Sequence, residues 1–330
     1  MSYEASWDRI HQPGQDDDWQ ESDCYWFYDA EAGVGGYQRI GQKPNIGAGQ
    51  VTLFAFARDG GRFTLNDGFV NDRPISADDR WEDGHQVDSH RADSLGDGRM
   101  RYRWNEGGCT GDLEFYKSFH TPRGWSKTGH EESFMEAMNP GGHLECSGRL
   151  RGRIEIAGKS YDIDALAHRD RSWGFRDFSG FDYHRFRMFS GTVGEELSLA
   201  TFVCDTAQGR TVAGYVVRNG VDEDIADLRV MVTIDADGLT AIGGMTHVTL
   251  ASGEILKIPH RGVQGYVTQF AANNSFLVDT ISEIEFAGKT GFCDSVHCIN
   301  PARGSRMPEQ DDTLYLAVDR GASTFVDYKL

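Results

Sequence analysis

Short runs of alternating polar and apolar residues, separated by turns rich in glycine, asparagine and aspartate, recur along this chain of 330 residues. This period-two pattern is typical of strands with one buried face, whereas the 3.6-residue period of an amphipathic helix is nearly absent. The Asn219-Gly220 pair between two such runs is a strong signal for a tight hairpin. We predict strands over 111–119, 151–156, 211–217, 228–234, 247–250, 254–258, 276–278, 284–286 and 314–318.

Many short strands with frequent turns favour β-sandwiches or barrels, and the length of the chain favours two domains. We therefore predict an all-β fold of two consecutive antiparallel β-barrel or sandwich domains with few short helices. One such helix is expected near Glu131 to Met138, because Asn139-Pro140 would end it. The predicted organisation is a loosely ordered arm over 1–20, a first β-domain over 21–158 and a second over 159–330.

The composition is acidic: 51 aspartates and glutamates against 33 lysines and arginines give a formal net charge of -18. Such a charge repels phosphate backbones, so we expect no nucleic-acid partner. The first residues lack the basic and apolar regions of a secretory signal, and the apolar runs are too short to span a bilayer. The six cysteines show no paired C-x-x-C spacing. We predict a soluble, cytoplasmic protein with free thiols and no membrane insertion.

The segment with the densest reactive side chains is 168–187, HRDRSWGFRDFSGFDYHRFR. Its first three residues mimic the catalytic loop of protein kinases, but Phe175 stands where that loop needs a magnesium-binding asparagine. The sequence has no glycine-rich phosphate loop followed by a helix, no complete zinc-ligand set and no nucleophile elbow. We therefore expect chemistry that uses neither a metal nor a cofactor.

Two interpretations of this segment are open. On a strand, His168 and Asp170 would face one side, and Arg169 and Arg171 the other. In the functional interpretation, Asp170 beside His168 exchanges protons inside a barrel, where burial and charged neighbours tune its proton affinity. In the structural interpretation, the arginines and the aspartate form a buried network that ties two strands together.

The run from His168 to Gly174 resembles the R-D-x-S-W-G signature of bacterial proteins similar to the AttH and hydroxyneurosporene synthase (carotenoid hydratase) superfamily. This resemblance implies two lipocalin-like β-barrel domains and a relationship to hydratases of isolated alkenes and to fungal Diels–Alderases of decalin formation. It also implies that Asp170 matches the aspartate that some members use as an acid near aromatic residues. The opening of the chain agrees at Trp19-Gln20-Glu21-Ser22, Tyr28-Asp29, Gly35-Gly36, Arg39-Ile40-Gly41 and Pro44-Asn45.

Together these observations predict a cofactor-independent lyase, hydratase or cyclase that uses acid–base chemistry. Its substrate would be a hydrophobic small molecule, such as a terpenoid, a steroid-like compound or a polycyclic aromatic, bound between the two barrels. Asp170 is expected to be catalytic, with His168 as a proton relay. The residues expected to orient Asp170 or to bind substrate are Arg169, Arg171, Trp173, Arg176, Tyr183, His184, Phe186, Met188, Glu21 and Tyr28.

Two other functions are compatible with the same patterns. Lipocalin-like barrels often carry hydrophobic ligands without catalysis, and the charged cluster would then be structural. A carbohydrate-active β-sandwich would need two carboxylates about 5 to 9 Å apart. The sequence offers Asp162, Asp164 and Asp182 as candidates for such a pair.

Overall fold

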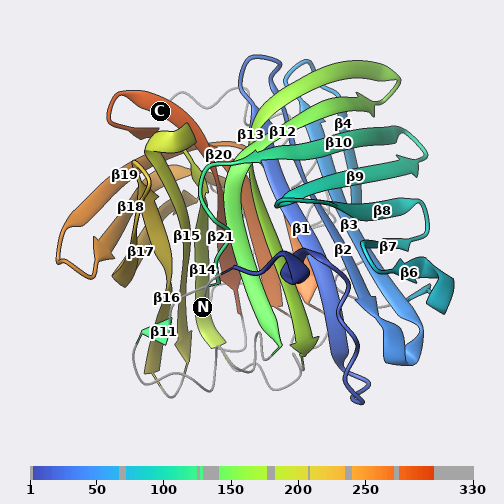
Figure 1. Ribbon diagram of the computed structural model, residues 1–330. Helices are drawn as coiled ribbons and strands as arrows, with labels where there is room; N and C mark the ends of the chain where they lie inside the picture. The colour runs from blue at the N-terminus through green and yellow to red at the C-terminus, as the bar shows by residue number, and fades with distance from the viewer. Residues whose placement is uncertain are drawn as a thin grey trace. The chain divides into compact units, whose positions relative to one another are not determined.

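The computed structural model describes residues 3–66, 72–124, 127–128, 141–176, 183–206, 209–234, 240–270 and 275–300 (Figure 1). As predicted, these residues form an all-β protein; its paired strands are antiparallel, and the described ranges contain four short 3-10 helices and no α-helix. The chain divides into two compact units, Met1–Gly124 with Ser133–Asp177, and Trp125–Glu132 with Phe178–Leu330. Within the described ranges, no helix has the length and apolarity that a membrane crossing would need.

The first unit is built on one twelve-stranded sheet, in which β5 lies beside β3 and the other strands follow the order β4-β3-β2-β1-β13-β12-β10-β9-β8-β7-β6. The 3-10 helices η1 (Ala5–Asp8), η2 (Pro44–Ile46) and η3 (Ala77–Asp79) accompany it. The strands are β1 (Trp19–Asp29), β2 (Val34–Lys43), β3 (Ala48–Ala57), β4 (Arg62–Asn66), β5 (Arg73–Pro74), β6 (Arg80–Trp81), β7 (Gly84–Val87), β8 (His90–Gly96), β9 (Arg99–Glu106), β10 (Cys109–Ser118), β12 (Gly142–Ile156) and β13 (Lys159–Phe175).

The two sides of this sheet have different environments. One side, which we call the core face, holds the hydrophobic core, including Tyr25 of β1 and Cys146 of β12. Directly paired residues of neighbouring strands point to the same side. Arg169 pairs with both Tyr25 and Cys146, so it lies on the core face, and His168 and Asp170 lie on the other side, the opposite face.

Burial explains where the alternating pattern is visible in the sequence. On β9, Met100, Tyr102 and Trp104 are buried, and the residues between them are exposed or half-buried. Strands β1, β2 and β3 are instead buried along almost their whole length. A strand that is covered on both sides has no polar side to alternate with, so these strands do not show the pattern.

The second unit contains an eight-stranded antiparallel barrel, coloured from yellow to red in Figure 1. Each strand of the barrel pairs with the next strand in the sequence, and the barrel closes because its first strand, β14, pairs with its last, β21. The hairpin turn at Asn219-Gly220 has φ angles of 50° and 79°, as its sequence predicts. The elements are β11 (Lys127–Thr128), which adds to β16, then β14 (Tyr183–Thr192), η4 (Gly194–Glu196), β15 (Leu197–Thr206), β16 (Gly209–Arg218), β17 (Val221–Ile234), β18 (Ala241–Leu250), β19 (Ile255–Phe270), β20 (Ser275–Phe286) and β21 (Lys289–Ile299).

The organisation differs from the prediction at two places. Strand β13 pairs with β1 and β12, so the HRDRSWG motif belongs to the first unit, and the boundary predicted after residue 158 falls within the β12–β13 hairpin. A tight turn between two long strands was mistaken for a domain junction. The amino-terminal arm is also better ordered than predicted, because it contains η1, whose Asp8 is buried.

The predicted strands can be compared with the observed ones wherever the chain is described. Those over 111–119, 151–156, 211–217, 228–234, 247–250, 254–258, 276–278 and 284–286 lie within or largely within β10, β12, β16, β17, β18, β19 and β20. The strand predicted over 314–318 and the helix predicted near residues 131–138 lie outside the described residues.

Candidate functional site

Strand β13 divides the side chains of the HRDRSWG motif between the two faces of the first sheet. Arg169, Arg171 and Trp173 point to the core face, and His168 and Asp170 point to the opposite face. The predicted alternation is therefore confirmed. The two faces hold different chemical groups.

On the core face, the two arginines are paired with three acids. The Arg171 guanidinium donates to Glu21 Oε1 at 2.5 Å and also to Asp23. The Arg169 guanidinium donates to Asp8 from η1 and to the Gly98 carbonyl. Both arginine side chains are at most 1% exposed. Since buried charges need partners, this network ties η1, β1 and β13 together.

Electrostatics around Glu21 fit a stable ion pair. Burial by itself would raise the pKa of Glu21, but the charge of Arg171 and a hydrogen bond from His11 lower it to about 2. Arg80 donates a further hydrogen bond to Glu21 Oε2 at 3.0 Å. Glu21 is thus a member of the core-face network, which favours a structural role over the substrate contact that was predicted for it.

Two expectations about the motif are wrong. Arg169 and Arg171 do not orient Asp170, because they lie on the other face of the sheet. Trp173, which was also expected to orient Asp170 or to bind substrate, does not lie beside Asp170 either, since it shares the face of the arginines. Its ring stacks on the His11 ring with centroids 3.8 Å apart and meets the Trp7 ring edge-on.

On the opposite face, β12 and β13 together hold a chain of histidines and carboxyl groups, joined by hydrogen bonds and, between His143 and Glu145, by an ion pair. His143 Nε2 lies 2.8 Å from Asp170 Oδ2 and 3.3 Å from Glu145 Oε1. The other oxygen of Glu145, Oε2, lies 2.7 Å from His168 Nε2. His168 Nδ1 then lies 2.8 Å from the Ser147 hydroxyl. We call Asp170, His143, Glu145, His168 and Ser147 the relay chain.

Asp170 is the accessible end of the relay chain. Its side chain is 15% exposed, compared with 7% for His143 and 0% for both Glu145 and His168. A small molecule approaching this part of the first unit would therefore meet the Asp170 carboxyl group first. Proton transfer further along the chain would pass through buried groups.

The buried groups of the relay chain have shifted acidities. Burial would lower the pKa of His143, but the charges and hydrogen bonds of Asp170 and Glu145 raise it to about 9. Burial would raise the pKa of Glu145, but hydrogen bonds and positive charge from His143 and His168 lower it to about 2. At neutral pH the centre of the chain is thus an imidazolium beside a carboxylate, a combination that stores a proton next to Asp170.

The same groups are candidate metal ligands. One ligand atom from each of His143, Glu145 and Asp170 lies within 4.8 Å of the other two. Two ligands of one zinc ion, each bound at about 2.0 to 2.2 Å, would stand roughly 3 Å or more apart. The 2.8 Å separation of His143 Nε2 and Asp170 Oδ2 is instead a hydrogen-bond distance. The geometry therefore fits a shared proton better than a shared ion.

Aromatic side chains continue the opposite face beside the relay chain. Trp26 of β1 pairs with His168, and its ring centroid lies 6.2 Å from the His168 ring and 5.0 Å from the Tyr37 ring. Phe54 of β3 pairs with Tyr37. Tyr28, a predicted site residue, shares this face but pairs with Leu166, four positions along β13 from Asp170.

Arg176 is the predicted arginine that the structure places near Asp170. Burial and the charge of Arg39 lower the pKa of Arg176 to about 10, while the charge of Asp170 opposes that change. Its guanidinium donates to the Ser172 hydroxyl at 2.9 Å. Arg176 is therefore the arginine of the predicted set whose pKa depends on the charge of Asp170, and its role toward Asp170 stays a prediction.

The other predicted residues lie elsewhere. Phe186 and Met188 belong to β14 of the second unit, where the Phe186 ring meets the Phe202 ring edge-on with centroids 4.8 Å apart. The side chains of Tyr183 and His184, and the whole of Asp182, lie outside the described residues. Asp162 and Asp164 are exposed residues of β13, and the Asp164 carboxylate forms an ion pair with Arg149.

Sequence reasoning missed His143, Glu145 and Ser147. They alternate with Leu144 and Cys146, which are fully buried. This period-two run of polar residues predicts one polar face on a strand, and β12 was recognised only from residue 151 onward. The β12–β13 hairpin places this face beside His168 and Asp170. That pairing was not predicted, because the turn of the hairpin was interpreted as a domain boundary.

The fold and the relay chain define an all-β protein of two units, one with a closed eight-stranded barrel and one with a buried histidine–carboxylate chain. The chain belongs to the family of a domain of unknown function, DUF7064, whose model matches residues 4–301. No protein with curated information matches the sequence.

Solved structures with a similar fold cover most of this chain. An AttH candidate from Nitrosomonas europaea superposes with a TM-score of 0.59 at 13% identity, over 89% of this chain and 95% of that one. CghA, solved with Sch210972, superposes with a TM-score of 0.55 at 12% identity, over 86% of this chain and 88% of that one. Kievitone hydratase from Nectria haematococca superposes with a TM-score of 0.52 at 10% identity, over 85% of this chain and 88% of that one. At such low identity these similarities establish the fold alone, and they agree with the AttH-like fold expected from the motif.

Proposed function

We propose that this protein is a cofactor-independent lyase, hydratase or cyclase that acts by acid–base chemistry on a hydrophobic small molecule. The observation that carries the proposal is the relay chain, in which the partly exposed Asp170 is hydrogen-bonded to a buried, proton-rich His143. Two structural neighbours support the substrate class: one is named kievitone hydratase, and the other, CghA, was solved with the small molecule Sch210972.

In a hydration, the Asp170–His143 pair would transfer a proton to one carbon of a double bond, forming a C–H bond. Water would add to the neighbouring carbon, and the extra proton of that water would return to the pair. Glu145 would stabilise the imidazolium form of His143 during these transfers, and His168 would hold Glu145 in place. Aromatic rings such as Trp26 would stabilise a cationic intermediate through their faces.

Asp170→Asn tests this proposal. A panel of prenylated aromatic, terpenoid and polyene compounds, including kievitone, is incubated with the protein in heavy water, and deuterium incorporation is followed by mass spectrometry. The variant is expected to lose about 10²- to 10⁴-fold in rate, the usual contribution of a general acid–base group. Its melting temperature should fall, because the change removes the carboxylate that stabilises the His143 imidazolium, so rates are compared at a temperature where circular dichroism shows both proteins folded.

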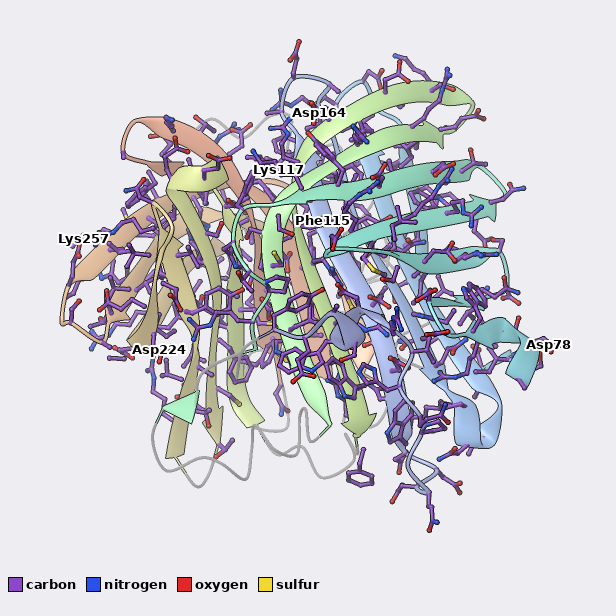
Figure 2. The ribbon with its side chains drawn as sticks, in the orientation of Figure 1. Asp78, Phe115, Lys117, Asp164, Asp224 and Lys257 are labelled. Carbon is purple, nitrogen blue, oxygen red and sulfur yellow. The ribbon has the colours of Figure 1, made fainter. Side chains whose placement is uncertain are left out.

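Asp164→Asn is the matched control, because Asp164 lies on the same strand but has a side chain that is 63% exposed (labelled in Figure 2). This control should keep full activity. Full activity in Asp170→Asn would overturn the proposal. Compounds that bind the wild type but are never converted would favour the alternative of a non-catalytic carrier.

A further inference from the structure

Residues 3–11, which we call the strap, lie against the core-face network of the first unit. The strap contains η1, the dark blue coil in Figure 1, and its Asp8 is the acid that pairs with β13. Two of its rings, those of Trp7 and His11, contact the Trp173 ring. The strap therefore brings one carboxylate and two aromatic rings to the core face.

The two buried arginines of the core face obtain their counter-charges from different parts of the chain. Arg171 is paired with Glu21 and Asp23, which both belong to strand β1. In the part of the chain that the structure describes, Arg169 forms its one ion pair with Asp8 of the strap. The sheet alone thus neutralises Arg171, whereas the charge of Arg169 depends on the strap.

Asp8 is bound as a buried carboxylate. It is 2% exposed, and the Tyr3 hydroxyl donates to it at 2.5 Å. Burial would raise the pKa of Asp8, but the charge of Arg169 and hydrogen bonds from Arg169 and Tyr3 lower it. On the side of the sheet, the Arg169 guanidinium also donates to the Gly98 carbonyl and lies over the Phe115 ring. These contacts do not involve the strap, so they hold Arg169 toward the place that a carboxylate occupies.

Backbone hydrogen bonds hold the strap far less firmly than they hold the strands. Strand β13 is paired along its length with β1 and β12. Among the described residues, a single backbone hydrogen bond, from the Ile10 N–H to the Glu82 carbonyl at 3.1 Å, joins the strap to the rest of the first unit. Residues 12–17, which connect the strap to β1, are exposed. Segments with so few backbone hydrogen bonds open without global unfolding, so the strap can detach while the sheet stays folded.

We propose that Arg169 is a binding site for a carboxylate, that Asp8 of the strap occupies this site from within the chain, and that a ligand displaces the strap. The ligand carries a carboxylate beside an aromatic ring, because the strap presents Asp8 next to Trp7, whose ring meets the Trp173 ring edge-on. Displacement exchanges one ion pair for another, so the buried guanidinium regains a counter-charge.

A fluorescein-labelled peptide with the sequence of residues 3–11 tests this site in the full-length protein, and fluorescence anisotropy follows its binding. The peptide makes the same contacts as the strap, so it should half-saturate the wild type at the effective concentration of the tethered strap, on the order of 1 mM. Asp8→Asn in the protein should lower this concentration about tenfold or more, because its own strap loses a charged hydrogen bond. The Asp8→Asn form of the peptide should bind about tenfold more weakly than the original peptide. Equal affinity of the wild type and the Asp8→Asn protein for the original peptide would overturn the proposal.

Arg9→Gln is the matched control within the strap, because the ion pair of Arg9 with Glu82 joins side chains that are 52% and 73% exposed. It should change the half-saturation by less than about fivefold. Asp170→Asn should bind the peptide like the wild type, since Asp170 lies on the opposite face. That result separates this inference from the proposed function.

Hydrogen exchange of the wild type tests displacement without any variant. Indole-3-propionate, added above the effective concentration of the strap, should speed the exchange of the Ile10 and His11 amides, which the docked strap bonds to Glu82 and Glu21. The neutral indole-3-propionamide should not, and the amides of β13 should stay protected with both compounds. Release by the small acid identifies a free aromatic acid as the ligand, and binding of the peptide alone identifies an acidic protein segment. Strap amides that exchange only together with those of β13, whatever is added, would overturn the proposal.

Discussion

The two faces of β13 carry the two halves of one short motif. The charged side chains of the two halves differ in how completely they are buried and paired with opposite charges. On the core face, Arg169 and Arg171 are buried against Asp8, Glu21 and Asp23. On the opposite face, the relay chain ends at Asp170, whose carboxyl group is partly exposed. The core face thus resembles a structural ion-pair network, and the opposite face resembles a proton-transfer site.

This difference shows that one dense charged motif supplies side chains to two chemically different faces of a sheet. Alternation along one strand separates the groups that tie the sheet together from those that can exchange protons. The structural interpretation of the sequence therefore describes the core face, and the functional interpretation stays a prediction for the opposite face. The acids of the structural network come from η1 and β1 rather than from the motif itself.

The largest effect is expected from Arg171→Met. It leaves Glu21 and Asp23 without the guanidinium that neutralises both, so the free energy of unfolding should fall by about 3 to 5 kcal/mol. Urea denaturation measures the change. Arg101→Met is the control, because Arg101 and its partner Asp112 have side chains 44% and 50% exposed; it should cost less than about 1 kcal/mol. Equal losses in both variants would contradict the structural role of the core face.

The next effect is the pH dependence that His143 contributes. Its pKa is raised from 6.5 to about 9 in the folded protein. The stabilisation is therefore fully present below about pH 6.5 and is lost as the pH rises through about 9. It amounts to roughly 3 kcal/mol at most, since a tenfold change in acidity corresponds to about 1.4 kcal/mol.

Denaturation of the wild type and of His143→Gln across this pH range measures that contribution. The difference in unfolding free energy between the two proteins should be largest at the acidic end and should shrink toward pH 9. A difference that stays constant with pH would show that His143 is not the imidazolium at the centre of the relay chain.

A smaller effect is expected from Glu145→Gln. Removing this carboxylate should lower the pKa of His143 by about one, or about 1.4 kcal/mol, because Asp170 still holds the imidazolium. Histidine NMR titration measures the shift. Glu106→Gln is the matched control, since Glu106 bonds a different buried histidine, His90, at 3.0 Å. If both variants left the His143 titration unchanged, Glu145 would not belong to the chain.

Local pattern predicts most of the fold and about one half of the site. Alternation on β10 and the Asn219-Gly220 turn are read directly from the sequence, as is the division of the motif between two faces. The partners of the motif could not be predicted in the same way. Asp8 reaches β13 from a segment far apart in the chain. Glu145 reaches it across the β12–β13 hairpin, whose turn was interpreted as a domain boundary.

The smallest loss of stability is expected from removing either of two serine hydroxyl groups on the opposite face, and an NMR measurement distinguishes their roles. Ser147→Ala and Ser22→Ala each remove a buried hydrogen bond, the first to His168 Nδ1 at 2.8 Å and the second to the Ser172 hydroxyl at 3.2 Å. Each should cost about 1 kcal/mol of stability. Only Ser147→Ala should change the ¹⁵N shifts of His168, because of these two serines only Ser147 bonds a ring nitrogen of His168. Identical His168 spectra in both variants would place Ser147 outside the relay chain and shorten it to the four groups that end at His168.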